Sequence, residues 1–228
     1  MSQLDHPNIV RCLGACMTPP KMFFVMELCE SSLFDDLHKH RRMFSTHELV
    51  QMAVDVAEAI NYLHLLSPPI IHRDVKSHNV LIAKGGVLKL CDFGLVRTRS
   101  VTAGTPAYMS PELLANKPFT RAVDIYAFGM LLWELFTQEI PYYGLEVADI
   151  RDVVMSGERP SIPRGECPVA IRELIRDCWD ADPSARPTAK TLIEELRIVL
   201  EELPGKTNLE MLDHSLGGGD CLDDLLLG

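Results

Sequence analysis

The stretch from Asp124 to Phe136 constrains the fold more than any other part of the sequence, because nearly all of its residues are apolar. A helix that is apolar on every side is either buried in a folded domain or embedded in a membrane. The longest apolar run, Ile125 to Phe136, is broken by Glu134 and is too short to cross a bilayer, which takes about 18 to 20 such residues. The sequence therefore predicts a buried helix inside a globular domain.

The composition is that of a folded protein in a reducing compartment. The 228 residues are 47% hydrophobic and 24% charged, and a chain of this length can bury a sizeable core. With 22 Lys and Arg against 32 Asp and Glu, the net charge of −10 argues against a general nucleic-acid binder. Seven cysteines without a C-x-x-C pair indicate reduced thiols. The first residues lack the basic and apolar regions of a signal peptide, so we expect a cytoplasmic protein with no membrane segment.

Local patterns predict strands first and helices later. Residues 8–28 read as two strands around a turn at 18–21, and residues 31–40 read as a short helical stretch. Ser45 and Glu48 form a capping-box pattern that starts a helix ending before Pro68. The apolar runs 80–83 and 87–90 flank Lys84-Gly85-Gly86 and predict a hairpin. Further helices are expected near 146–156, 168–179 and 188–202, the last capped by Thr188.

The residues that carry chemistry surround this hairpin. Because a hairpin brings its two ends together, Asn79 and Asp92 are expected to meet. An amide oxygen and a carboxylate are hard donors that suit Mg²⁺ carrying phosphates. Asp74 lies before the first strand and could accept the proton of an attacking hydroxyl, and Lys76 offers a positive charge to a transferring phosphoryl group. This set supplies the positioning and charge neutralisation on which phosphoryl transfer depends.

Residues 72–79 read H-R-D-V-K-S-H-N and resemble the catalytic loop of the protein kinase family, H-R-D-L-x-x-x-N. Further matches follow in the family's order, and they are D-F-G at 92–94, S-P-E at 110–112 in place of A-P-E, the buried helix whose Asp124 holds the catalytic-loop backbone, and Arg186, which pairs with Glu112. The resemblance runs from about residue 4 to about residue 202. It implies an α+β protein-kinase-like fold, mainly the helical large lobe with the last strands of the small lobe.

The resemblance also implies a role for individual residues. By position, Asp74 would be the catalytic base and Lys76 the γ-phosphate contact, while Thr105 would bond both of them. Asn79 and Asp92 would be the Mg²⁺ ligands. The expected cofactors are ATP and Mg²⁺, and the expected adenine site consists of the gatekeeper Met26, the hinge residues Glu27 and Cys29, Leu81 as its floor, and Cys91.

The same resemblance indicates the class of substrate. Lys76 and the G-T-P-A-Y-M stretch at 104–109 match the serine/threonine kinases, and L-D-H-P-N-I-V at 4–10 resembles the tyrosine-kinase-like group. The expected partner is a protein substrate with Ser or Thr hydroxyls. Arg73 implies a phosphorylated activation loop and hence an upstream activating kinase. The candidate phosphosites are Thr98, Ser100 and Thr102.

The kinase pattern also needs a Gly-rich loop, a Lys on an early strand and a Glu on the helix that positions this Lys. No Gly-x-Gly-x-x-Gly precedes residue 30, and the only Lys before Glu27 is Lys21. We therefore expect an N-terminally truncated kinase, inactive as this chain stands, with a small-lobe remnant at 1–28, the large lobe at 29–202 and a flexible tail at 203–228. The alternative is a non-catalytic kinase-like interaction module or pseudokinase fragment.

Overall fold

Two groups of strands and a body of helices make up the described part of the chain. In the computed structural model this part comprises residues 4–16, 18, 23–92, 104–163, 165 and 167–203. In chain order the elements are β1 (Cys12–Cys16), β2 (Phe23–Met26), β3 (Ser31–Ser32), η1 (Asp35–Lys39), α1 (Thr46–Leu65), η2 (Ser77–Asn79), β4 (Val80–Ile82), β5 (Leu88–Leu90), η4 (Pro106–Tyr108), α2 (Pro111–Leu114), α3 (Ala122–Thr137), α4 (Val147–Met155), α5 (Val169–Cys178) and α6 (Ala189–Glu202). This mixture confirms the α+β class.

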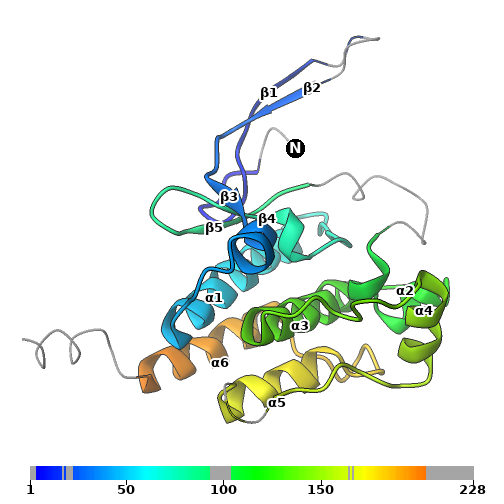
Figure 1. The fold of residues 1–228 in the computed structure, drawn as a ribbon. Coiled ribbons are helices and arrows are strands. Elements are labelled where there is room, and N and C mark those ends of the chain that lie inside the picture. The colour runs from blue at the N-terminus through cyan, green and yellow to red at the C-terminus, as the bar shows by residue number, and fades with distance from the viewer. Residues whose placement is uncertain are drawn as a thin grey trace, which may run out of the picture.

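Helix α3 is the buried helix that the apolar stretch predicts. Every residue from Val123 to Phe136 is buried, and the helix packs against α1 and α5 (Figure 1). The contact with α5 is closest at Gly129, where an added Cβ would lie 2.6 Å from Cβ of Cys178. A side chain at Gly129 would therefore force the two helices apart.

Replacing Gly129 with Ala is expected to lower the free energy of unfolding by about 1–3 kcal/mol, because the new methyl group overfills this contact. Urea denaturation followed by circular dichroism measures the loss. Gly165→Ala is the matched control, since an added Cβ there meets no atom within 4 Å. Equal midpoints for the two variants would show that the helices separate at little cost.

Helix α1 begins with the predicted capping box. The Ser45 hydroxyl accepts from the Glu48 N–H at 3.3 Å, and the Glu48 carboxylate accepts from the Ser45 N–H at 2.9 Å. The helix packs on α6 as well as on α3. The α6 cap is also confirmed, because the Thr188 hydroxyl accepts from the Thr191 N–H at 3.1 Å. Both caps satisfy backbone donors that a helix start leaves unpaired.

The predicted hairpin is confirmed as β4 and β5, and it lies in an antiparallel sheet with the order β3-β4-β5. The third strand differs from expectation, because Ser31 and Ser32 pair with β4 instead of starting a helix. The helical stretch predicted for 31–40 is limited to residues 33–39, which include η1. The segment before β1 also joins this sheet, since the Val10 N–H donates to the Leu90 carbonyl at 3.0 Å.

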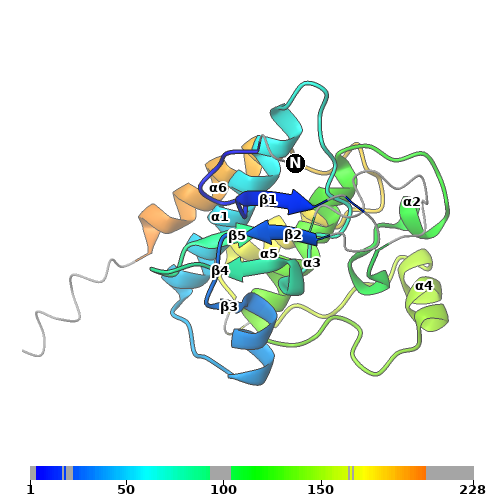
Figure 2. The same cartoon turned by 90° about the horizontal axis from the view of Figure 1, so that it is seen from above.

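Strands β1 and β2 form a separate antiparallel pair that projects from the helical body (Figure 1) and is seen from above in Figure 2. All of β2 is exposed, with Phe23, Phe24 and Met26 each about half accessible to solvent. The predicted turn at 18–21 lies outside the described residues except for Thr18, and so does the predicted tail from residue 204. Among the described residues, no helix combines the length and apolarity that a membrane span requires.

Candidate active site

The loop that carries Asp74 is fastened to helix α3 by Asp124. This carboxylate is fully buried and accepts hydrogen bonds from the backbone N–H of His72 at 2.9 Å and of Arg73 at 2.7 Å. The His64 ring is a further partner at 2.8 Å. Arg73 has a left-handed backbone with φ of 67°, which costs free energy for a residue other than Gly. The two backbone bonds to Asp124 offset this cost and fix the direction in which the chain reaches Asp74.

Asp74 stands at the centre of the three partners that the family pattern names. Its carboxylate lies 2.9 Å from Nζ of Lys76 and accepts from the Asn79 amide at 2.8 Å. The Thr105 hydroxyl donates to it at 3.1 Å and the Thr105 N–H at 3.2 Å. Lys76 also donates to the Thr105 hydroxyl at 2.6 Å. These bonds connect residues about thirty positions apart into one constellation around a carboxylate that is 8% exposed.

These partners keep the carboxylate ionised. Burial alone raises the pKa of Asp74, but the Lys76 ammonium and the hydrogen bonds from Asn79 and Thr105 outweigh it, so that the pKa lies below the ordinary value. A carboxylate with a lowered pKa is negatively charged at neutral pH. Asp74 is therefore a hydrogen-bond acceptor for a hydroxyl that approaches this site.

Asn79 and Asp92 lie at neighbouring strand ends, as the hairpin predicts. The Cys91 N–H donates to the Asn79 carbonyl at 2.8 Å, so the backbone of Asn79 is next to the residue that precedes Asp92. The Asn79 amide nitrogen is directed at Asp74, which turns its side-chain oxygen away from that carboxylate. An amide oxygen and an exposed carboxylate on adjacent strand ends fit the donor set of Mg²⁺, which typically takes one or two protein ligands together with phosphates and water.

The residues expected around adenine belong to β2, to the segment that follows it, to β4 and to the position that directly follows β5. Met26 ends β2 and Leu81 is the middle residue of β4. The side chain of Glu27 is engaged within the chain, because it accepts from Nζ of Lys89 at 2.9 Å and from the Arg11 N–H at 2.7 Å. The pairing of Glu27 with Lys89 was not predicted from the sequence. This ion pair links the segment that follows β2 to β5.

The two cysteines near the expected adenine site have thiols that burial keeps protonated. Burial, with the neighbouring Asp92 carboxylate, raises the pKa of Cys91 to about 12. Burial and the Glu27 carboxylate also raise the pKa of Cys29. A protonated thiol is a weak nucleophile. These directions favour the interpretation of Cys91 as a small apolar residue of the site over that of a reactive group.

Sequence reasoning missed the part that Glu134 plays near this site. The Glu134 carboxylate is completely buried on α3 and accepts from the hydroxyls of Ser77 and Tyr108, each at 2.6 Å. The His38 ring lies 2.8 Å from the same carboxylate. The signal in the sequence was the lone acidic residue within the apolar run, since a buried carboxylate needs donors from elsewhere in the fold.

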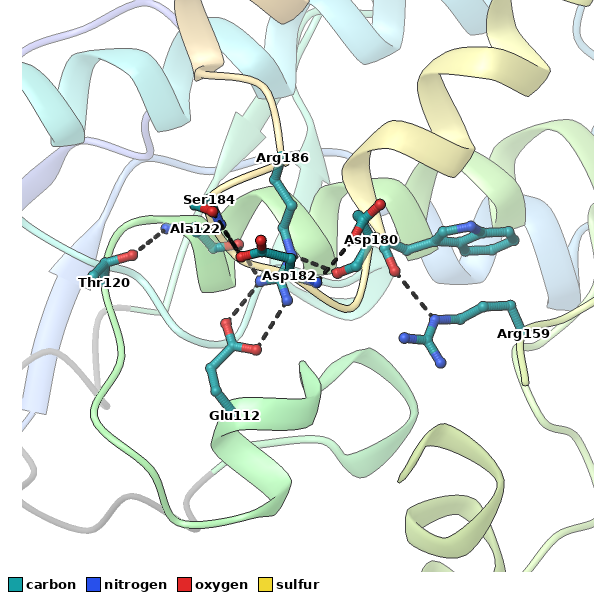
Figure 3. Close-up of polar contacts among 9 residues, drawn as sticks. Glu112, Thr120, Ala122, Arg159, Asp180, Asp182, Ser184 and Arg186 are labelled. Atoms are coloured by element: carbon teal, nitrogen blue, oxygen red, sulfur yellow. Dashed lines mark hydrogen bonds and ion pairs between the residues drawn. The ribbon is translucent and has the colours of Figure 1, made fainter. Parts of the chain in front are cut away.

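The predicted pair between Arg186 and Glu112 is confirmed. The guanidinium donates to both carboxylate oxygens, at 2.7 and 2.9 Å, and both side chains are buried (Figure 3). It donates further to the carbonyls of Asp180 at 2.9 Å and Ala122 at 2.9 Å. The pair joins α2, which follows the segment that bears Thr105, to the loop between α5 and α6 (Figure 3).

A comparison with known families matches residues 1–196 to the protein tyrosine and serine/threonine kinases. The chain belongs to this family. The arrangement described above is therefore mainly the helical large lobe of the kinase-like fold, and the resemblance to the protein kinase family is confirmed.

Curated relatives from several organisms are named as protein kinases, and some of them as serine/threonine-protein kinases. The chain is 40% identical over 212 residues to serine/threonine-protein kinase CTR1 of Arabidopsis thaliana, covering 88% of this chain and 26% of that protein. It is 38% identical over 228 residues to mitogen-activated protein kinase kinase kinase 10 of Homo sapiens, covering 93% and 24% respectively. A probable serine/threonine-protein kinase of Dictyostelium discoideum, drkC, is 37% identical over 209 residues, covering 86% and 28%. The chain thus spans about a quarter of the length of these relatives.

Proposed function

We propose that this chain provides the catalytic lobe of a serine/threonine protein kinase, which transfers the γ-phosphoryl group of ATP to a protein hydroxyl. The observation that carries the proposal is the bonded set of Asp74, Lys76, Asn79 and Thr105. Its residue types are those of a site that accepts a proton and neutralises phosphate charge. The relatives named as serine/threonine-protein kinases support the substrate class.

In the proposed reaction, Asp74 orients the substrate hydroxyl and accepts its proton while the hydroxyl oxygen bonds to the γ-phosphorus. The bond from the γ-phosphorus to the bridging oxygen breaks, and ADP leaves with that electron pair. Lys76 balances the charge on the moving phosphoryl group. Asn79 and Asp92 would hold Mg²⁺, which neutralises the phosphates when bound.

The surroundings of this site support further proposals about partners and location. The guanidinium of Arg73 lies 5.5 Å from the centre of the Phe119 ring, and the Arg73 carbonyl oxygen lies 3.4 Å from the position that a Cβ on Gly104 would take. A phosphate placed on Thr98, Ser100 or Thr102 by an upstream kinase could pair with Arg73. Reduced cysteines and an acidic balance fit a cytoplasmic protein.

One observation favours a non-catalytic interaction module for this polypeptide taken alone. Its 228 residues contain neither the Gly-rich loop nor the strand Lys that hold the phosphates of ATP in the family. Met26, Glu27 and Cys29 would contact only the adenine end of the nucleotide. We therefore expect the isolated polypeptide to bind protein partners without turnover.

Adding the parts that the family pattern needs and that these 228 residues lack would separate the two functions. We would join the Gly-rich loop, the Lys-bearing strand and the Glu-bearing helix of the CTR1 kinase domain to the N-terminus and measure transfer from radiolabelled ATP to myelin basic protein. The chimera is expected to transfer phosphate at least about a thousandfold faster than the 228-residue polypeptide, because the phosphates regain their donors.

The control is the same chimera with the grafted Lys replaced by Met. Transfer by the 228-residue polypeptide at the chimera's rate would contradict the need for those parts. A folded chimera that binds MgATP without transferring phosphate would instead support the non-catalytic module.

A further inference from the structure

Glu134 joins the two chain segments that supply partners to the proposed catalytic base. Ser77, which donates to Glu134, is the first residue of η2 and directly follows Lys76. Tyr108, which donates to the other carboxylate oxygen, lies three residues after Thr105 at the end of η4. Lys76 and Thr105 are bonded to each other at 2.6 Å. One buried side chain therefore fixes both ends of that contact.

Burial makes these bonds decisive for the local geometry. Glu134 is inaccessible to solvent, and so is Ser77, while Tyr108 is 6% exposed. Buried polar groups that lose their partner cannot turn to water instead, and hydrogen bonds to a carboxylate are about twice as strong as neutral ones. The contacts of 2.6 Å are short even for this class. The segments bearing Ser77 and Tyr108 are therefore attached to α3 by buried hydrogen bonds to a carboxylate.

The third partner, His38, extends the cluster to η1. Its ring lies 2.8 Å from the same oxygen that accepts from Ser77. Phe34, four residues earlier, contacts His38 at a tilted angle, with 4.8 Å between the ring centroids, and stacks on His78 at 3.7 Å. His78 follows Ser77 directly, so η1 supports the same turn from its other side. Glu134 is the point at which η1, η2 and η4 meet on α3.

We propose that Glu134 is a positioning residue for phosphoryl transfer, acting through Ser77 and Tyr108 on the placement of Lys76 and Thr105 around Asp74. This inference rests on the proposed kinase function. Glu134 itself touches no reacting atom. It complements Asp124, the carboxylate on the same helix that fixes the approach to Asp74 from the other side.

The first test measures steady-state kinetics in the chimera described above, with variants Glu134→Gln and Tyr108→Phe. We expect each to lower kcat by about tenfold or more, with the KM for ATP within about twofold, because misplacement affects the transition state more than nucleotide binding. Tyr126→Phe is the matched control, since Tyr126 is buried on the same helix and its hydroxyl is not a partner of Glu134, which is bonded to His38, Ser77 and Tyr108. Unchanged kcat in Glu134→Gln would overturn the proposal.

The second test uses amide hydrogen exchange in the 228-residue polypeptide and does not depend on catalysis. Glu134→Gln is expected to speed exchange in the segments 74–79 and 104–109 at least about tenfold, while α6 keeps its protection. Faster exchange throughout the chain, or none in those segments, would overturn the positioning role. An inactive wild-type chimera would contradict the proposed function alone, and the exchange pattern would then decide whether Glu134 fixes the two segments.

Discussion

Replacing Asp74 with Asn in the chimera is expected to lower kcat for phosphoryl transfer by about a hundredfold to ten-thousandfold, the range that a proton acceptor contributes. The amide has almost the same shape as the carboxylate but cannot take the hydroxyl proton. It also removes the negative charge that binds Lys76 at 2.9 Å. The KM for ATP should change little, because Asp74 contacts Lys76, Asn79 and Thr105 and none of the residues expected around adenine.

The measurement is transfer of radiolabel from ATP to a protein substrate under saturating conditions. Asp177→Asn is the matched control, because Asp177 is an exposed carboxylate on α5. Its kcat should equal that of the parent chimera. If the kcat of the Asp74→Asn variant equalled that of the parent chimera, the role assigned to Asp74 would be wrong.

The second large effect concerns stability. Replacing Arg186 with Met is expected to lower the free energy of unfolding by about 3–5 kcal/mol, because it leaves the buried Glu112 carboxylate without its counter-charge. The carbonyls of Asp180 and Ala122 lose their donors as well. Urea denaturation of the 228-residue polypeptide should show a midpoint lowered by about 1–2 M.

Two further variants separate charge from packing. Arg176→Met removes an exposed guanidinium from α5 and should leave the midpoint nearly unchanged. The double variant Arg186→Met with Glu112→Met should be more stable than Arg186→Met alone, because no unpaired charge then remains buried. A double variant no better than the single one would show that packing and the carbonyl contacts, and not the charge of Glu112, account for the loss.

The sequence was most informative for elements whose structure depends on residues adjacent to one another in the chain. The capping box at Ser45, the cap at Thr188 and the apolar run of α3 are local patterns, and all three are confirmed. Ser31 and Ser32 form a strand only because β4 lies beside them. Their own residues carry no strand pattern, and the prediction of a helix there was wrong for this reason.

In the candidate site, too, local patterns predicted contacts between nearby elements but not contacts between distant residues. The hairpin pattern alone brought Asn79 close to Asp92, because a tight turn fixes which strand ends meet. The contact of Thr105 with Asp74 and Lys76 spans about thirty residues, and only the family resemblance predicted it. Glu134 was visible as an anomaly in an apolar run, but its donors come from three distant elements. No local pattern could name them.

The projecting β1–β2 pair has a consequence for the behaviour of this polypeptide in solution. Leu13, Phe24 and Met26 are each about half exposed, and Leu28 is 96% exposed. In the described part of the chain the pair has no third strand, so both of its edges present open backbone groups. Open strand edges that carry large apolar side chains promote edge-to-edge association. The 228-residue polypeptide should therefore aggregate as its concentration rises, and any partner that covers this pair will act as its solubilising factor.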